Sequence, residues 1–239
     1  MKEVNQLKAL LLIGALTCIF STQSIAGLIT NGGFESGFIG WTRADKIGEG
    51  TFIVQTGLLS PINSFSVPTS PEGSNVAMTD SEGPGSHALY QDFLVPTSVS
   101  SGSIGFSLFL NNQAQDFFNP GHLDFSTIDL NQQARVDILS TSADPFAVNV
   151  LKNLFQTTSG DPLVSGYNPF LFDVTGFLQD HQGETLRLRF SETDNVNYFN
   201  FGVDNVSLST QVPEPSSLLL VALYGFSGLT AWGYRRRAD

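Results

Sequence analysis

The side chains that most often carry out catalysis or bind metals are few and widely spaced in this sequence of 239 residues. Its three histidines, His87, His122 and His181, fall on separate segments, and no His-x-x-x-His or His-Glu-x-x-His pattern is present. Zinc binding is therefore not expected from the sequence. The sequence also lacks a Gly-x-Ser-x-Gly nucleophile motif, a catalytic Cys/His pair and a glycine-rich phosphate loop.

Carboxylate pairs are the remaining candidates for catalysis, because a glycosidase needs two carboxyl groups several ångström apart. Such pairs occur at Asp80 with Glu82 and at Glu192 with Asp194. The chain has 22 acidic and 11 basic residues, so these pairs also arise by chance. Because the second pair directly follows an arginine-containing segment at 185–190, we interpret it as part of a surface salt-bridge cluster.

The elements that would position these side chains are short strands. Several segments alternate apolar and polar residues and are bounded by Gly, Pro, Asn, Asp or Ser, as in sheets with one buried face. The predicted strands are 51–55, 87–95, 103–110, 134–139, 171–174, 185–190 and 202–208. Residues 145–155 fit either a short helix or another strand. No long amphipathic helix is indicated, so we predict an all-β fold, a two-sheet sandwich of about eight strands.

Charge limits the partners of this domain. Residues 27–211 contain six Lys and Arg against 19 Asp and Glu. Nucleic acids and anionic lipid surfaces are recognised by clustered Lys and Arg, so neither is an expected partner. Calcium ions and neutral sugars are compatible with this composition.

The C-terminus combines a Pro-Glu-Pro triplet, an uncharged hydrophobic stretch and an arginine cluster. In order these are Pro213, Glu214 and Pro215, then residues 216–234, then Arg235, Arg236 and Arg237. A helix of 19 residues at about 1.5 Å per residue spans roughly the 30 Å hydrocarbon layer of a membrane. The arginines would stay on the cytoplasmic side and the rest of the chain outside the cytoplasm. A plain C-terminal transmembrane anchor fits these physical properties equally well.

The same three elements resemble the PEP-CTERM sorting tail of bacterial exported proteins. We assign residues 210–239 to this tail. The resemblance implies cleavage near residues 213–215 by an exosortase-type transpeptidase, in a bacterium that makes extracellular polysaccharide. The protein would then pass through the inner membrane transiently and reach the cell surface or the extracellular matrix of a biofilm.

The N-terminus agrees with export. Lys2 and Lys8 precede an apolar run at 9–20. Small residues follow this run, and we place a signal-peptidase site after Ala26. Residues 1–26 are therefore predicted to be a signal peptide. The chain's one cysteine, Cys18, lies inside it and fits a lipoprotein motif poorly. The mature protein would have no disulfide, so its stability must come from a core, with a bound metal ion as a further source.

The two ends of the predicted domain, residues 27–209, carry a second resemblance. Residues 31–41 begin Asn-Gly-Gly-Phe-Glu and residues 202–208 contain Asp-Asn-Val. They resemble the first and last strands of carbohydrate-binding-module-like jelly rolls, the galactose-binding-like fold. This resemblance implies a structural calcium ion where the ends meet, with Glu35 and Asp204 as side-chain ligands and Gly33 donating its carbonyl. The alternative is that both carboxylates bond to backbone groups in turns.

Trp41 is the one tryptophan outside the tail, and sugars stack on exposed aromatic rings. In the matching position of the family the Gly-Trp tryptophan packs in the core, so we expect Trp41 in the core. Other aromatic candidates for sugar contact are Tyr90, Phe117, Phe118, Tyr167, Tyr198 and Phe199. We expect a non-catalytic surface or matrix protein. The alternative is a secreted lectin or glycan-active enzyme, which would show exposed aromatic side chains over a concave sheet, or a cleft with two buried carboxylates of raised pKa.

Overall fold

The computed structural model describes residues 24–61, 64–80 and 82–212, and residues from Ile25 to Val212 form one compact unit. Eleven strands and one short helix are present in this part of the chain. The strands are β1 (Ser24–Gly27), β2 (Thr42–Asp45), β3 (Phe52–Thr56), β4 (Asn75–Thr79), β5 (Gly85–Leu94), β6 (Ser101–Asn112), β7 (Gln132–Ser140), β8 (Lys152–Gln156), β9 (Asn168–Asp173), β10 (Thr185–Asp194) and β11 (Phe199–Val212). The helix is α2 (Thr175–Asp180).

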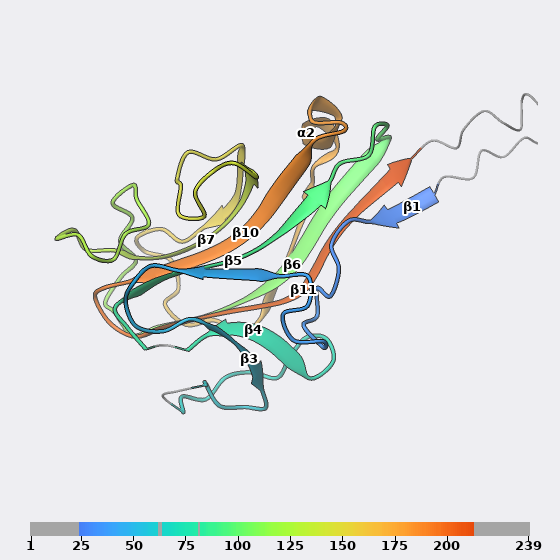
Figure 1. Ribbon diagram of the computed structural model, residues 1–239. Coiled ribbons are helices and arrows are strands. Elements are labelled where there is room, and N and C mark those ends of the chain that lie inside the picture. Colours follow the sequence, from blue (N-terminus) through green and yellow to red (C-terminus); the bar gives the residue numbers. More distant parts are fainter. Residues whose placement is uncertain (1–23, 62–63, 81, 213–239) are drawn as a thin grey trace, which may run out of the picture. The chain divides into compact units, whose positions relative to one another are not determined.

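The strands form two antiparallel sheets that pack face to face (Figure 1). One sheet has the order β3-β4-β11-β6-β9, with β1 also paired to β11, and the other has the order β2-β5-β10-β7-β8. The predicted all-β, two-sheet sandwich is confirmed. All seven predicted strands are present; β1, β2 and β4 were not identified, and β8 overlaps the segment 145–155 that fitted either a helix or a strand.

The core lies between the sheets and follows the alternation read from the sequence. In β10, Leu186, Leu188 and Phe190 are buried in the core. In β6, every second residue from Ile104 to Leu110 is also buried there. Because successive side chains of a strand point to opposite faces, Arg187 and Arg189 lie on the outer face of the same sheet.

Part of this outer face is covered by the chain between β7 and β8. Arg189 is fully buried and donates through Nη1 to the carbonyl oxygens of Pro145 and Ala147, at 2.7 Å each. The segment 145–155, which fitted either a helix or a strand, is a loop as far as Leu151 and then enters β8. The carbonyl oxygens of Pro145 and Ala147 accept hydrogen bonds from the buried Arg189 guanidinium, so they are not available for hydrogen bonds within a helix.

The two ends of the domain meet as expected from the sequence. The Val206 N–H donates to the carbonyl oxygen of Gly32 at 3.0 Å, beside a register shift in β11 between Asp204 and Ser207. A Cβ atom on Gly32 would overlap the Val206 carbonyl. Trp41 is only 7% exposed, and its indole N–H donates to the Asn31 carbonyl oxygen at 3.0 Å. The prediction that Trp41 packs in the core is confirmed.

Candidate functional site at the polar end of the sandwich

Pairing of β5 with β10 brings a histidine and two carboxylates together between the sheets. In the register of these strands, Glu192 lies opposite His87 and Asp194 lies opposite Gly85. Glu192 and Asp194 continue the inward-facing row of β10, so the core ends in acidic groups on this side of the sandwich. They are 1% and 3% exposed. The expected surface salt-bridge cluster with Arg187 and Arg189 is therefore wrong, because the arginines lie on the opposite face.

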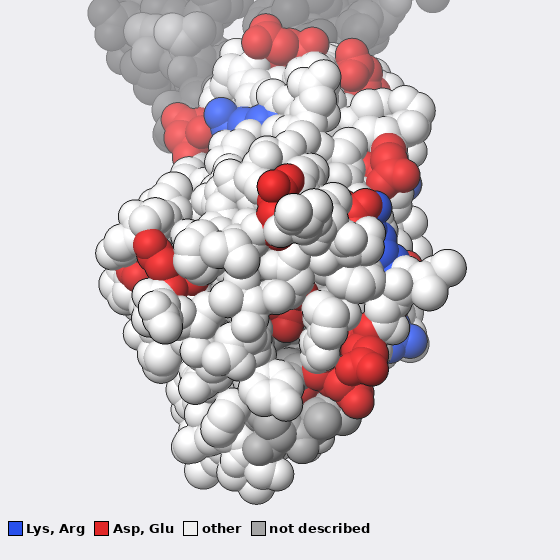
Figure 2. Space-filling model, turned by 90° about the vertical axis from the view of Figure 1, so that its left-hand side faces the viewer, with Lys and Arg blue, Asp and Glu red and all other residues white. Residues whose placement is uncertain are grey.

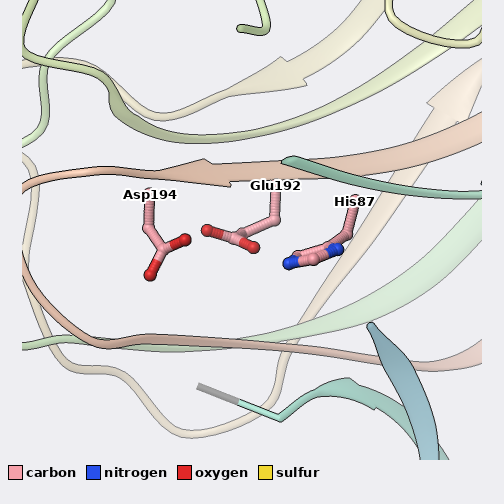
Figure 3. A group of neighbouring side chains, drawn as sticks. All are labelled: His87, Glu192 and Asp194. Carbon is pink, nitrogen blue, oxygen red and sulfur yellow. The ribbon is translucent and has the colours of Figure 1, made fainter. Parts of the chain in front are cut away.

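The three side chains form a compact group that we call the polar-end triad: His87, Glu192 and Asp194. One potential ligand atom from each lies within 4.8 Å of the others. Figure 3 shows the Glu192 carboxylate between the Asp194 carboxylate and the His87 ring. Among the described residues, no other set of three His, Cys, Asp or Glu side chains meets this distance.

Each member of the triad has a different hydrogen-bonding environment. Asp194 Oδ1 accepts the Gly85 N–H at 2.9 Å. His87 Nδ1 lies 2.8 Å from Asp45 Oδ1, which belongs to the neighbouring strand β2. Glu192 Oε1 is buried and has no hydrogen-bond partner within the described chain. The triad is thus held at its two outer members and unsatisfied at its centre.

Glycine backbone packs tightly around the triad. A Cβ atom on Gly83 would overlap the Asp194 carboxylate, and one on Gly85 would overlap the His87 ring. A Cβ on Gly50, whose φ of +88° favours glycine, would lie 3.1 Å from His87 Nε2. Side chains at these three positions would occupy the space that the triad uses.

Burial raises the pKa of the acids at this end. Desolvation raises the pKa of Glu192 well above its usual range, and the neighbouring charges of Asp194 and Asp80 raise it further. Desolvation also raises the pKa of Asp194 to about 7, against the opposing effect of the Gly85 N–H. Asp80 shows a raised pKa for the same reason, burial. Two buried carboxylates of raised pKa were the feature that sequence reasoning assigned to an enzyme.

A pocket of about 270 Å³ adjoins the triad and is lined by Gly83, Pro84 and residues 194–198. Asp194 is the triad member that borders it. Tyr198 is 51% exposed at this pocket. The Asn195 side-chain amide already donates to the Phe125 and Asp129 carbonyls. The Asn195 amide therefore holds the loop between β6 and β7 together through hydrogen bonds to its backbone.

The other aromatic candidates for sugar contact do not form an exposed cluster. Phe117 and Phe199 are 1% exposed, while Phe118, Tyr90 and Tyr167 are half-buried. Tyr90 lies beneath the Arg187 guanidinium, with 4.0 Å between the guanidinium carbon and the ring centroid. Among these candidates Tyr198 is the exposed ring.

The residues expected to bind calcium lie at a second place, around the loop at 70–75. Glu35 Oε1 accepts the backbone N–H groups of Ser74 and Asn75, at 2.7 Å each. Asp204 Oδ2 accepts the Glu72 N–H at 3.0 Å. A Cβ on Gly33 would lie 3.1 Å from Glu72 Oε2. Both predicted ligands therefore hold the same loop through backbone hydrogen bonds, and calcium binding there stays a prediction.

Sequence reasoning named Glu192 and Asp194 but did not connect them with His87. The sequence feature that could have placed these two acids between the sheets is the alternation of Leu186, Leu188 and Phe190, which continues through positions 192 and 194. The sorting residues 213–215 and 235–237 lie outside the described residues, as does most of the predicted signal peptide. No helix within the described ranges is long and apolar enough to cross a membrane.

Comparison with known proteins identifies the C-terminal segment. Residues 211–237 match the family described as the PEP-CTERM protein-sorting motif. No curated protein matches the chain.

Solved structures with a similar fold include carbohydrate-binding, adhesin and enzyme domains. TmCBM61, solved in complex with beta-1,4-galactotriose, is 12% identical, with 77% of this chain and 97% of that chain covered and a TM-score of 0.45. The K3 cleaved adhesin domain of Lys-gingipain from Porphyromonas gingivalis W83 is 15% identical, with coverage of 77% and 98% and a TM-score of 0.46. The enzymatically active domain of tailspike protein 4 from bacteriophage CBA120 is 13% identical, with a TM-score of 0.42, and the match covers 77% of this chain but 21% of the tailspike chain. Beyond this all-β sandwich, the chain carries a PEP-CTERM protein-sorting motif that begins at the end of β11.

Proposed function

We propose that this protein is a non-catalytic surface or extracellular-matrix protein that an exosortase-type system sorts and that associates with extracellular polysaccharide. The observation that carries the proposal is the sorting motif at residues 211–237, which follows a compact domain. Such a motif implies export and processing by an exosortase. Cys18, the one cysteine of the chain, lies outside residues 25–212, so a compact cysteine-free domain is what would be delivered to the cell surface.

Two features support this proposal: the placement of the triad carboxylates, which disfavours catalysis, and the charge of the surface. Of the two triad carboxylates, only Asp194 borders the pocket, and Glu192 is 1% exposed. A pair that acts on a glycoside must reach both sides of the bond to be broken. The face drawn in Figure 2 shows acidic groups scattered among uncharged surface, with few basic side chains. That surface suits an acidic exported protein and offers little for nucleic acid.

The experiment is an intact-mass measurement on the protein isolated from its own cells, with each cell fraction analysed separately. We expect loss of about 26 residues at the front, together with loss of the segment after residues 213–215. A Glu214→Ala variant is the matched control, which we expect to retain the C-terminal segment. Retention of residues 216–239 in the native protein would overturn the sorting proposal and favour a plain anchor.

A second candidate is a glycan-binding role, which the exposed Tyr198 ring beside the pocket favours. A glycan array combined with a hydrolase screen tests it on the full chain. Selective binding that is lost in Tyr198→Ala would establish a lectin, and turnover would establish an enzyme. Absence of both, at protein concentrations that detect weak lectins, supports the non-catalytic matrix role.

We also propose that calcium stabilises the domain where its ends meet. The side chains of Glu35, Glu72 and Asp204 border one loop and offer oxygen atoms, which calcium prefers. Burial and the nearby charge of Glu72 raise the pKa of Asp204. A divalent cation would offset both effects. These three carboxylates do not converge within 4.8 Å as the triad does, so a calcium ion would have to draw them together.

A further inference from the structure

We propose that the polar-end triad of His87, Glu192 and Asp194 binds one divalent transition-metal ion of the class of Zn²⁺. This site is separate from the calcium site proposed at Glu35 and Asp204, and it does not depend on the sorting function. It rests on the convergence of three ligand atoms within 4.8 Å and on a buried carboxylate oxygen that lacks a partner.

The unsatisfied oxygen is the first step of the argument. Glu192 is 1% exposed and its Oε1 accepts no hydrogen bond within the described chain. Buried charges in proteins are normally paired or bound to metals. All six Lys and Arg side chains of residues 27–211 are engaged elsewhere. Arg43 contacts Phe52, Lys46 contacts Asp124, Arg135 and Arg189 contact Asp137, Arg187 contacts Asp92, and Lys152 lies over Phe177.

The charges of the Glu192 and Asp194 carboxylates must therefore be neutralised by either a proton or a cation. A shared proton would neutralise one of the two acids, as in other close carboxyl pairs. A metal ion would neutralise both and would also use the histidine. The position of His87 beside the carboxylates favours the metal.

The orientation of the imidazole is the second step. His87 Nδ1 lies 2.8 Å from Asp45 Oδ1, and an ionised carboxylate can only accept a hydrogen bond. Nδ1 therefore carries the proton, and in the neutral ring Nε2 keeps its lone pair. Histidines that bind metals commonly donate their other ring N–H to a carboxylate, which fixes the ring. In this arrangement Asp45 is a positioning residue that does not touch the metal.

Size and ligand chemistry select the ion. A tetrahedral zinc ion at about 2.0–2.2 Å from its ligands holds those ligand atoms roughly 3.4 Å apart. Zinc binding would require the present spacing, which is within 4.8 Å, to close to that value. An imidazole nitrogen with two carboxylates suits zinc or manganese, whereas calcium takes oxygen ligands. The pocket borders Asp194, so an ion would approach the triad from the side of that residue.

The test is a titration of the untagged, metal-stripped full chain with Zn²⁺. Isothermal titration calorimetry measures the binding, and metal analysis gives the stoichiometry. We expect one Zn²⁺ per chain and a thermal unfolding midpoint that rises with Zn²⁺. Glu192→Gln should weaken binding by roughly 100-fold or more, because it removes a charged ligand. Glu184→Gln is the matched control, since Glu184 forms an exposed pair with His181 at 3.0 Å. Its affinity should equal that of the native chain.

A second variant keeps the test decisive if Glu192→Gln does not fold. Asp45→Asn changes a partly exposed side chain and should weaken Zn²⁺ binding by about 10–100-fold. Absence of stoichiometric Zn²⁺ binding to the native chain would overturn the proposal. Binding that is unchanged in both variants would also overturn it, and the carboxylates would then share a proton. Loss of binding in Glu35→Gln alone would place the ion at the other site and equally refute the triad.

Discussion

Replacing Asp137 by asparagine is the sharpest test of the packing on the outer face of the second sheet. Asp137 is fully buried and accepts hydrogen bonds from Arg135 Nε and Nη2, at 2.8 Å each. It also accepts hydrogen bonds from Arg189 Nη2 and, at 2.8 Å, from Asn153 Nδ2. One carboxylate thus neutralises the fully buried Arg189 and also pairs with Arg135. Asp137→Asn keeps the shape of the side chain but removes this charge.

The expected loss of stability follows from the arginine charge that stays buried after the substitution. Removing one partner of a buried ion pair typically costs about 3–5 kcal/mol, because the other charge stays buried without compensation. Burial already lowers the pKa of Arg189, and Asp137 opposes that shift. In a domain of 150–250 residues, each kcal/mol lowers the unfolding midpoint by about 2–4 °C. We therefore expect Asp137→Asn to lower the midpoint by about 6–20 °C.

Asp92→Asn is the matched control, on strand β5 of the same sheet. Asp92 makes a two-bond pair with Arg187, at 2.7 and 3.0 Å, but its side chain is 39% exposed. Exposed pairs are worth about 1 kcal/mol or less. Thermal and urea unfolding of both variants, monitored by circular dichroism, give the two thermal midpoints and the two free energies of unfolding. If Asp92→Asn and Asp137→Asn cost the same, burial does not control the strength of these pairs and the reasoning is refuted.

Three further outcomes are expected. Gly32→Ala should destabilise the domain by about 1–3 kcal/mol in urea unfolding, because its Cβ would overlap the Val206 carbonyl; an unchanged midpoint would contradict the close approach. Calcium should raise the thermal midpoint of the native chain and EDTA should reverse this, whereas Glu35→Gln should abolish the response; a full response in Glu35→Gln would exclude this ligand. Tyr198→Ala should change the free energy of unfolding by less than about 0.5 kcal/mol, since the ring is half exposed; a larger loss would show that it packs into the fold.

The sequence by itself determined the architecture and the sorting motif. Alternation of apolar residues in 103–110 and 185–190 specified strands with one buried face, because a period of two matches only the pleat of a sheet. The Pro-Glu-Pro triplet, hydrophobic stretch and arginines indicated the sorting motif, because such signals are read from contiguous residues. Trp41 was placed correctly in the core.

Only the tertiary structure decided which polar groups meet. His87 and Glu192 become neighbours through the β5–β10 register, and the pattern within each segment does not show which strands pair. The loop that covers Arg189 likewise turns an apparently exposed arginine into a buried one. A shift of one residue in a strand would move every side chain to the opposite face. The chemistry of this domain therefore depends on pairings between distant segments, while its fold class depends on patterns within each segment.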